Sequence, residues 1–211
     1  MTAAPNQLAA QFGDIDVYLF DQLLRGRITP RMTVLDAGCG KGRNLVYLLR
    51  SGYRVLGVDE DPTAIDTVQR LAREVAPHLA PDCFRAEPIE AMTFPNGAAD
   101  VVISSAVLHF ARDETQFWDM LREMWRVLRP GGMFFCRLAS TIGMEGRFRQ
   151  LTGRRFTLPD GTERFLVDEA MLVDATERLG GQLLDPLKTS VVQNLRCMTT
   201  WVVRKPAASE R

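Results

Sequence analysis

VLDAGCGKGRN, residues 34–44, is the stretch of sequence that decides the fold. Two aliphatic residues lead into Asp36, and glycines then occupy every second position, at Gly38, Gly40 and Gly42. Glycine has no Cβ, so such a loop can turn tightly and bring its backbone close to a ligand. The residues behind it, 44–49, favour a helix. The stretch therefore predicts a strand, a cofactor-binding loop and a helix, although a tight turn without a ligand would use the same glycines.

Asp36 indicates which cofactor the loop would bind. A carboxylate at the mouth of the loop repels a pyrophosphate, whereas it attracts the ammonium group of a bound amino acid. The glycine spacing is GxGxG rather than the GxGxxG of dinucleotide-binding loops. We therefore expect S-adenosylmethionine, with S-adenosylhomocysteine as its product, and disfavour an NAD-linked oxidoreductase.

A second strand and helix follow at the expected distance. YRVLGVD, residues 53–59, is a short apolar run that ends in Asp59, 21 residues after Gly38. A βαβ unit places a carboxylate for the ribose hydroxyls at roughly 20 residues from its glycine loop. Asp61 then suits a helix N-cap, with Pro62 at the first helical position. This second unit favours the cofactor-binding interpretation over a simple turn.

Size and composition narrow the classes of function. A chain of 211 residues suits a single α/β domain. The 26 basic and 26 acidic residues cancel, which argues against a nucleic-acid partner bound through a basic face. The four cysteines form no CxxC or Cys/His spacing, so we predict reduced thiols in a cytoplasmic protein and no metal site. No apolar run approaches the roughly 18 residues of a membrane span, and the N-terminus lacks a signal-peptide pattern, so no membrane partner is expected.

Hydrophobic patterning predicts strands that alternate with helices. The expected helices are 14–25, 43–50, 62–76 and 113–128, and the expected strands are 33–37, 53–58, 82–86, 100–105 and 133–138. After residue 138 this alternation of strands and helices ends. A Gly- and Arg-rich stretch with a hairpin at 158–162 follows, then a helix capped by Asp168 and strands at 182–192 and 196–204. The pattern predicts an α/β, doubly wound, Rossmann-like and mostly parallel sheet with an antiparallel C-terminal strand pair. Ligands of such a sheet bind at the carboxyl ends of its strands.

Four elements in this order make the sequence resemble the class I S-adenosylmethionine-dependent methyltransferases over nearly its whole length. They are LDAGCGKG at 35–42, the acid Asp59, FPNGAADVV at 94–102 and LRPGG at 128–132. Residues 38–59 and the ending CMTTWVVRK are, in addition, similar to the tellurite-resistance type of small-molecule methyltransferases. The resemblance implies a seven-stranded sheet in one domain over 1–211, with an N-terminal helical cap at 1–30 and a substrate cover at 139–167. It also implies a small-molecule acceptor, and it leaves the oligomeric state open.

The resemblance carries cofactor roles to particular residues. Asp36, Gly38 and Gly40 would surround the methionine part, and Asp59 would bind the ribose hydroxyls. Arg43 is either a partner of the cofactor carboxylate or a solvated first-turn arginine. The family has an acid for the adenine amino group where this chain has Pro88; the preceding Glu87 and the Ile89 N–H are our candidates instead. The expected cofactor-binding residues are Asp36, Gly38, Cys39, Gly40, Arg43, Asn44, Asp59, Glu60, Glu87, Ile89 and Ser104.

The candidate substrate residues lie in the second half of the chain. His109, one turn beyond Ser104 and Ser105, is either packed beneath the next helix or in contact with substrate, and it is the one catalytic candidate. Six arginines against three acids lie between Arg137 and Arg164, where this fold inserts its substrate cover. The expected substrate-binding residues are His109, Arg147, Arg149, Arg154 and Arg155, the arginines suiting an anionic acceptor unless they only pair with the helices below.

No second histidine or paired carboxylate accompanies His109, which suggests a soft or already ionised nucleophile such as a thiol, a chalcogen or an oxyanion. Two alternatives stay open. One is a protein that binds the cofactor without transferring a methyl group, as a sensor or partner. The other is a methyltransferase that acts on protein or RNA.

Overall fold

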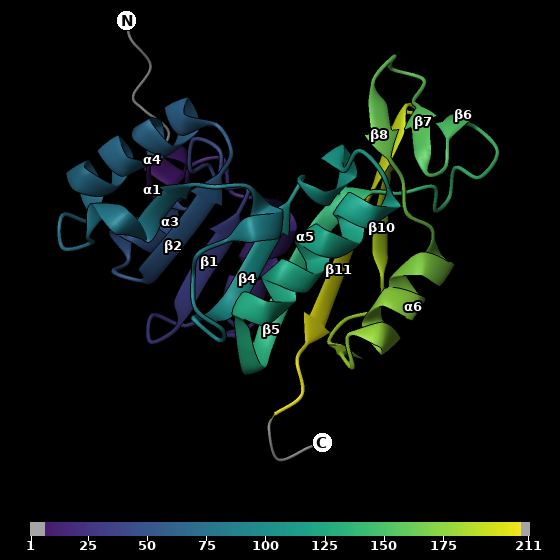
Figure 1. The fold of residues 1–211 in the computed structure, drawn as a ribbon. Coiled ribbons are helices and arrows are strands. Elements are labelled where there is room, and N and C mark those ends of the chain that lie inside the picture. The colour runs from purple at the N-terminus through teal and green to yellow at the C-terminus, as the bar shows by residue number, and fades with distance from the viewer. Residues whose placement is uncertain (1–6, 208–211) are drawn as a thin grey trace, which may run out of the picture. The chain divides into compact units, whose positions relative to one another are not determined.

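The computed structural model describes residues 7–207, and these fall into two compact units, one up to Thr93 and one from Phe94 (Figure 1). Both combine parallel strands with helices, as the alternating hydrophobic pattern predicts.

The first unit contains a three-stranded parallel sheet. β1 pairs with β2, with Val34 opposite Val55, and β2 pairs with β3, with Gly57 opposite Phe84. The strands and helices are β1 (Thr33–Ala37), β2 (Arg54–Asp59), β3 (Phe84–Ala86), α1 (Gln7–Phe12), α2 (Val17–Leu24), α3 (Val46–Arg50), α4 (Pro62–Val75), η1 (Pro81–Cys83) and η2 (Ile89–Ala91). The Asp61 carboxylate accepts the Thr63 N–H, which confirms the predicted N-cap of α4.

Two predicted helices of this unit are shorter than expected. The helix predicted at 14–25 is α2, which begins at Val17 because Asp16 caps it by accepting the Tyr18 N–H. The helix predicted at 43–50 begins only at Val46. Gly40 and Gly42 have φ values of 51° and 82°, which no right-handed helix uses, and the Leu45 N–H donates to the Gly42 carbonyl at 2.9 Å. Arg43 and Asn44 therefore lie in the turn before the helix and not at its start.

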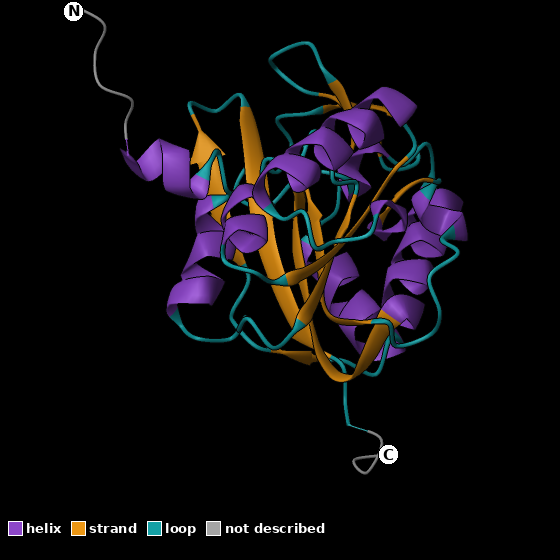
Figure 2. Ribbon diagram, turned by 90° about the vertical axis from the view of Figure 1, so that its left-hand side faces the viewer, coloured by secondary structure: helices purple, strands orange, loops and turns teal. Residues whose placement is uncertain are grey.

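The second unit contains a mixed sheet together with its own helices; Figure 2 colours strands orange and helices purple. β4 and β5 are parallel, and β11 joins the far side of β5 in the antiparallel sense. The elements are β4 (Ala99–Ser105), η3 (Leu108–Phe110), α5 (Glu114–Val127), β5 (Leu128–Ala139), α6 (Glu169–Arg178), β9 (Gln182–Leu183), β10 (Lys188–Val192) and β11 (Arg196–Arg204). β10 and β11 form the predicted antiparallel pair, whereas residues 182–183 make a separate short pairing with β11.

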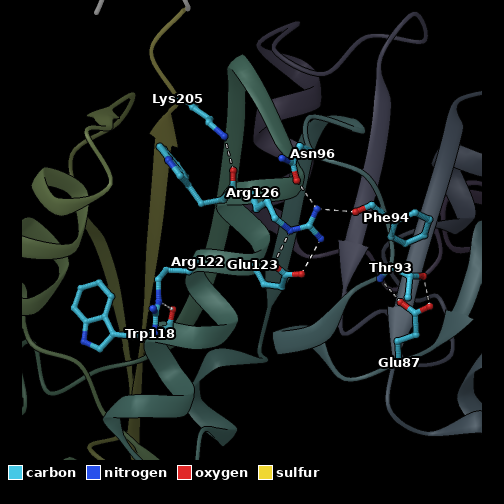
Figure 3. Close-up of polar contacts among 10 residues, drawn as sticks. Glu87, Thr93, Phe94, Asn96, Trp118, Arg122, Glu123, Arg126 and Lys205 are labelled. Carbon is cyan, nitrogen blue, oxygen red and sulfur yellow. Dashed lines mark hydrogen bonds and ion pairs between the residues drawn. The ribbon is translucent and has the colours of Figure 1, made fainter.

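Side chains close both ends of α5. Asp113 accepts the Gln116 N–H at the N-cap, and Lys205 donates to the carbonyls of Trp125 and Leu128 at the other end. The Arg126 guanidinium binds Glu123 and also the carbonyl of Phe94 and the amide oxygen of Asn96 (Figure 3). One face of this segment is apolar and buried, with Phe117, Met120, Leu121, Met124, Trp125 and Leu128. The helix is thus held by its buried apolar face and, at its C-terminal end, by Lys205, while Asp113 caps its N-terminus.

The stretch predicted as a substrate cover is a small sheet rather than an open loop. β6 (Arg149–Thr152), β7 (Arg155–Thr157) and β8 (Glu163–Phe165) form three antiparallel strands, and the hairpin predicted at 158–162 joins the last two. A bridge between Ser140 and Val167 closes its base, where the Thr141 N–H donates to the Val167 carbonyl at 2.8 Å. Strand β6 was not predicted.

Candidate functional site

The glycine loop and the end of β2 are held together by the Asp59 carboxylate. Its Oδ2 accepts the Gly40 N–H at 2.8 Å and its Oδ1 accepts the Asp61 N–H at 3.0 Å. Each carboxylate oxygen has a second lone pair, so the group can still accept a pair of hydroxyls. A Cβ on Gly40 would meet nothing within 4 Å, so the loop backbone faces open space at this point. The arrangement suits a ribose beside Asp59 and a ligand against Gly40.

Asp36 is a buried carboxylate beside the glycine loop. It is 1% exposed at the carboxyl end of β1, and neither carboxylate oxygen has a partner among the described residues. The pKa of Asp36 is raised from 3.8 to about 7, mainly by burial; the Arg43 charge and the Asn44 side chain reduce the shift, and the Asp59 charge adds to it. A buried, unsatisfied carboxylate is costly unless a cation or donor completes it. The residue therefore fits the ammonium group of S-adenosylmethionine.

Three other loop residues have packing roles. A Cβ on Gly42 would lie 2.8 Å from Val68 of α4, so the glycine lets the loop lie against that helix. The Cys39 thiol is buried and lies 3.1 Å from a Cβ built on Gly57, and burial raises its pKa. Only the backbone of Cys39 is thus available to a cofactor. The Asn44 amide oxygen accepts the Asp16 N–H at 3.0 Å and so ties α2 to the loop.

The candidates for the adenine lie beside Asp59. The Glu87 N–H donates to the Asp59 carbonyl at 3.1 Å, which brings the two residues together at the carboxyl edge of the parallel strands. The Glu87 carboxylate accepts two hydrogen bonds from Thr93, one from the backbone N–H at 2.8 Å and one from the side-chain hydroxyl at 2.5 Å (Figure 3). Ile89 is buried at the first position of η2, where an N–H has no acceptor within the helix. Glu60 is exposed.

In the second unit, the carboxyl end of β4 carries two buried serines and a strained residue. The Ser104 hydroxyl has no hydrogen-bond partner among the described residues, and Ser105 lies opposite Arg137 of β5. Ala106 has φ 64°, and its N–H donates to the Arg137 carbonyl at 2.7 Å. A left-handed alanine costs energy and is a recurrent feature of functional sites.

His109 is a buried, neutral histidine. Its Nδ1 accepts the Ala139 N–H at 3.2 Å, so the neutral ring carries its proton on Nε2. The pKa of His109 is lowered from 6.5 to about 4, mainly by burial and also by the charges of Arg164 and Arg137. In this state the ring can donate a hydrogen bond from Nε2, and it does not act as a base through Nδ1.

The arginines of the cover segment differ in their surroundings. Arg154 pairs with Asp168 at 2.9 Å, and Arg155 pairs with Glu163 at 3.3 Å and donates to the Ala111 carbonyl. Arg149 donates to the Thr157 hydroxyl, and Arg147 is exposed. The arginines whose charges act on His109 are instead Arg137 and Arg164, which sequence reasoning counted without assigning them to the site.

Residues 7–207 offer neither a metal-binding cluster of side chains nor a helix suited to a membrane. That part of the chain contains no group of three or more His, Cys, Asp or Glu residues that could hold a metal ion. None of its helices combines the length and the apolar character needed to cross a membrane.

Comparison with known proteins identifies the family. Residues 35–136 match the family model described as a methyltransferase domain. The chain is 31% identical over 209 residues to a ubiquinone biosynthesis O-methyltransferase of Methylobacterium nodulans, an alignment that covers 91% of this chain and 79% of that protein. It therefore belongs to the class I S-adenosylmethionine-dependent methyltransferases. The chain spans about half the length of several other curated relatives that it matches, 46% of one and 56% of another.

Solved structures share the fold. A methyltransferase of Methanosarcina mazei has a TM-score of 0.70 at 19% identity and covers 88% of this chain and 97% of that one. The 1,6-didemethyltoxoflavin-N1-methyltransferase of Burkholderia thailandensis, solved with 1,6-didemethyltoxoflavin and S-adenosylhomocysteine, has a TM-score of 0.65 at 20% identity. That match covers 98% of this chain and 92% of that one. The predicted Rossmann-like sheet, mostly parallel with antiparallel C-terminal strands, is confirmed.

Proposed function

We propose that this protein transfers the methyl group of S-adenosylmethionine to a small-molecule acceptor. The observation that carries the proposal is Asp36, a carboxylate 1% exposed whose oxygens have no hydrogen-bond partner within residues 7–207, beside an open glycine loop in a chain of this family. When bound, the cofactor supplies a methyl group on a positively charged sulfur. The chain itself would bind the cofactor's ammonium group through Asp36 and the cofactor's ribose through Asp59. It would also exclude water from the acceptor.

The acceptor atom in this proposal is a soft or already ionised nucleophile. A neutral alcohol or amine acceptor needs a base to take its proton. His109 is a poor base, because its Nδ1 is occupied by the Ala139 N–H and burial keeps its pKa near 4, lowered from 6.5. A thiolate, a chalcogen anion or an oxyanion does not need one. The same reasoning supports the relation to the tellurite-resistance type.

The remaining site residues are part of the same proposal. Gly38, Gly40 and the Cys39 backbone would contact the methionine part, and Glu87 and Ile89 would meet the adenine. Arg43, Asn44, Glu60 and Ser104 complete the proposed cofactor contacts. Arg147 and Arg149 are the cover arginines available to an acceptor, since Arg154 and Arg155 pair with acids of the chain.

The first experiment measures ligand-induced stabilisation. S-adenosylmethionine and S-adenosylhomocysteine should raise the Tm, because a ligand at a hundredfold excess over its Kd stabilises the native state by about 2.7 kcal/mol. NADH should not. The protein is then incubated with methyl-labelled cofactor and a metabolite extract, and the labelled product is identified.

Each alternative predicts a different result. Strong binding of the cofactor without a labelled product from metabolites, protein or RNA would favour a sensor or partner. A labelled product found only in protein or RNA would show that the acceptor is a macromolecule and not a small molecule. Stabilisation by NADH alone would refute the proposal.

A further inference from the structure

Four polar side chains stand in one row across the second unit. Ser105 of β4 is opposite Arg137 of β5, Arg137 is opposite Thr200 of β11, and Thr200 is opposite Lys188 of β10. Residues that pair in register project from the same face of a sheet, and neighbouring strands lie about 4.8 Å apart. Ser105, Arg137, Thr200 and Lys188 therefore form a continuous line, called here the polar row. It begins at the last residue of β4, at the carboxyl edge where α/β sheets bind their ligands.

Thr200 gives this row an unexplained feature. Its side chain is 4% exposed, and its hydroxyl has no hydrogen-bond partner among the described residues. Buried hydroxyls in proteins are nearly always paired, so an orphan one needs an explanation such as a ligand. Ser105, at 6% exposed, places a second hydroxyl in the same row. A valine in place of Thr200 would fill the same space without an unsatisfied group, so packing alone does not account for the threonine.

The chemistry of the row is that of an anion site. It holds two cationic side chains and two hydroxyls, all of which can donate hydrogen bonds. The next row toward the amino end of β4 is apolar, with Ile103, Phe135 and Val202. The row on the other side contains Ala139, Met198 and Ser190. The residues named in these two neighbouring rows include no acidic side chain.

His109 connects this row with the candidate acceptor site. The Arg164 guanidinium stacks on Phe110 at 4.8 Å, and the Phe110 ring lies 4.6 Å from the His109 ring. The charges of Arg164 and Arg137 both lower the pKa of His109. The Ala139 N–H that binds His109 is two residues beyond Arg137 on the same strand. The neutral ring directs a further donor, its Nε2–H, into surroundings that are already positive.

We propose that the polar row binds an oxyanion group, a carboxylate or a phosphate, carried by the methyl acceptor. Arg137 is the principal ligand, because its planar guanidinium can bind two oxygens of such a group at once. Thr200 and Lys188 bind the same group from β11 and β10. That the anion belongs to a methyl acceptor rests on the proposed function. Binding of the anion itself does not.

The test uses inorganic phosphate and benzoate as probes on the full chain, titrated by calorimetry at constant ionic strength without cofactor. Arg137→Gln and Lys188→Gln should weaken binding about tenfold or more, as expected for the loss of a charge-assisted hydrogen bond. Thr200→Val should weaken it severalfold while leaving the Tm equal or higher. Arg204→Gln is the matched control, since it removes one positive charge from the same strand, four residues beyond Thr200, and should change binding less than twofold.

The results separate this inference from the proposed function. If phosphate binds more tightly than benzoate, the row prefers a phosphate group; if benzoate binds more tightly, it prefers a carboxylate. Failure of both probes to bind, equal weakening by Arg204→Gln, or a Thr200→Val variant with lower Tm and unchanged binding would overturn the inference. Cofactor binding and methyl transfer are assayed separately. A protein that binds anions through the row and yields no methylated product would contradict the proposed function alone.

Discussion

The Asp59 carboxylate accepts the Gly40 N–H at 2.8 Å and thereby joins the end of β2 to the glycine loop that follows β1. The residue that the sequence marks for the ribose thus also holds the loop that faces the cofactor. A charged acceptor of two backbone N–H groups stabilises the loop before any ligand binds, and it fixes the position of its remaining lone pairs. Binding and local stability are therefore coupled at Asp59.

Two substitutions of Asp59 should separate these roles. Asp59→Ala should weaken binding of S-adenosylhomocysteine by about 1.5–3 kcal/mol for each lost ribose hydroxyl contact and should also destabilise the loop. Asp59→Asn keeps an oxygen for the Gly40 N–H, so its free energy of unfolding should stay near that of the wild type while affinity still falls. Calorimetry and urea denaturation measure the two quantities. If both variants keep wild-type affinity, the ribose does not bind at Asp59.

Stability without cofactor should fall as pH rises toward 8. The folded pKa of Asp36, about 7, is above its ordinary value of 3.8, so between these values the folded state binds more protons than the unfolded state. At about 1.4 kcal/mol per pKa unit, the loss over this window amounts to a few kcal/mol. Urea denaturation at pH 5, 6, 7 and 8 should show a decline that is much smaller in Asp36→Asn. Equal slopes in the two proteins would contradict this assignment.

Local signals explain which parts of the fold the sequence predicts. Strand β1 and helix α4 lie where they were expected, because an apolar run, an N-cap at Asp61 and Pro62 mark their ends within a few residues. The helix after the glycine loop was predicted three residues too early, since the helical propensity of 43–45 is overridden by the positive φ of Gly42. The short strand β6, with only four residues, has no clear periodicity.

The residues of the candidate site also differ in whether the sequence alone reveals them. Asp36, Asp59 and the glycines belong to contiguous motifs and are visible in the sequence. The polar row is not, because Arg137 and Thr200 become neighbours only through the register of two strands about 60 residues apart. The protonation state of His109 likewise depends on Ala139, which no local pattern connects with it.

His109 should remain neutral down to about pH 5. Its folded pKa, about 4, is below the ordinary 6.5, so the unfolded state binds more protons between these values and His109 destabilises the fold as pH falls through this window. Nitrogen-detected NMR of the imidazole should show a proton on Nε2 and no titration above pH 5. A midpoint near 6.5 would contradict the buried, neutral state.

Substitution of His109 tests its contact with the backbone. His109→Ala leaves the buried Ala139 N–H without an acceptor and should cost about 1–3 kcal/mol. His109→Asn can place an amide oxygen near the position of Nδ1 and should recover part of this loss. Denaturation at pH 7.5, where the wild-type ring is neutral, measures the difference. Equal losses in both variants would show that the hydrogen bond contributes little.

Ala106, in the left-handed region at φ 64°, offers the sharpest test of strain at the end of β4. A non-glycine residue in such a conformation costs about 1–2 kcal/mol, whereas glycine adopts it freely. Ala106→Gly should therefore leave the free energy of unfolding unchanged or raise it by up to about 1 kcal/mol, the gain being reduced by the greater entropy of the unfolded glycine. Ala111, with φ −49°, is the matched control, because the same change there relieves no strain and should destabilise the protein by about 0.5–1 kcal/mol. Ala106→Val should be worse than either, since a β-branched residue is least tolerated at positive φ. If Ala106→Gly destabilises the protein as much as Ala111→Gly, then no strain is stored at this strand end.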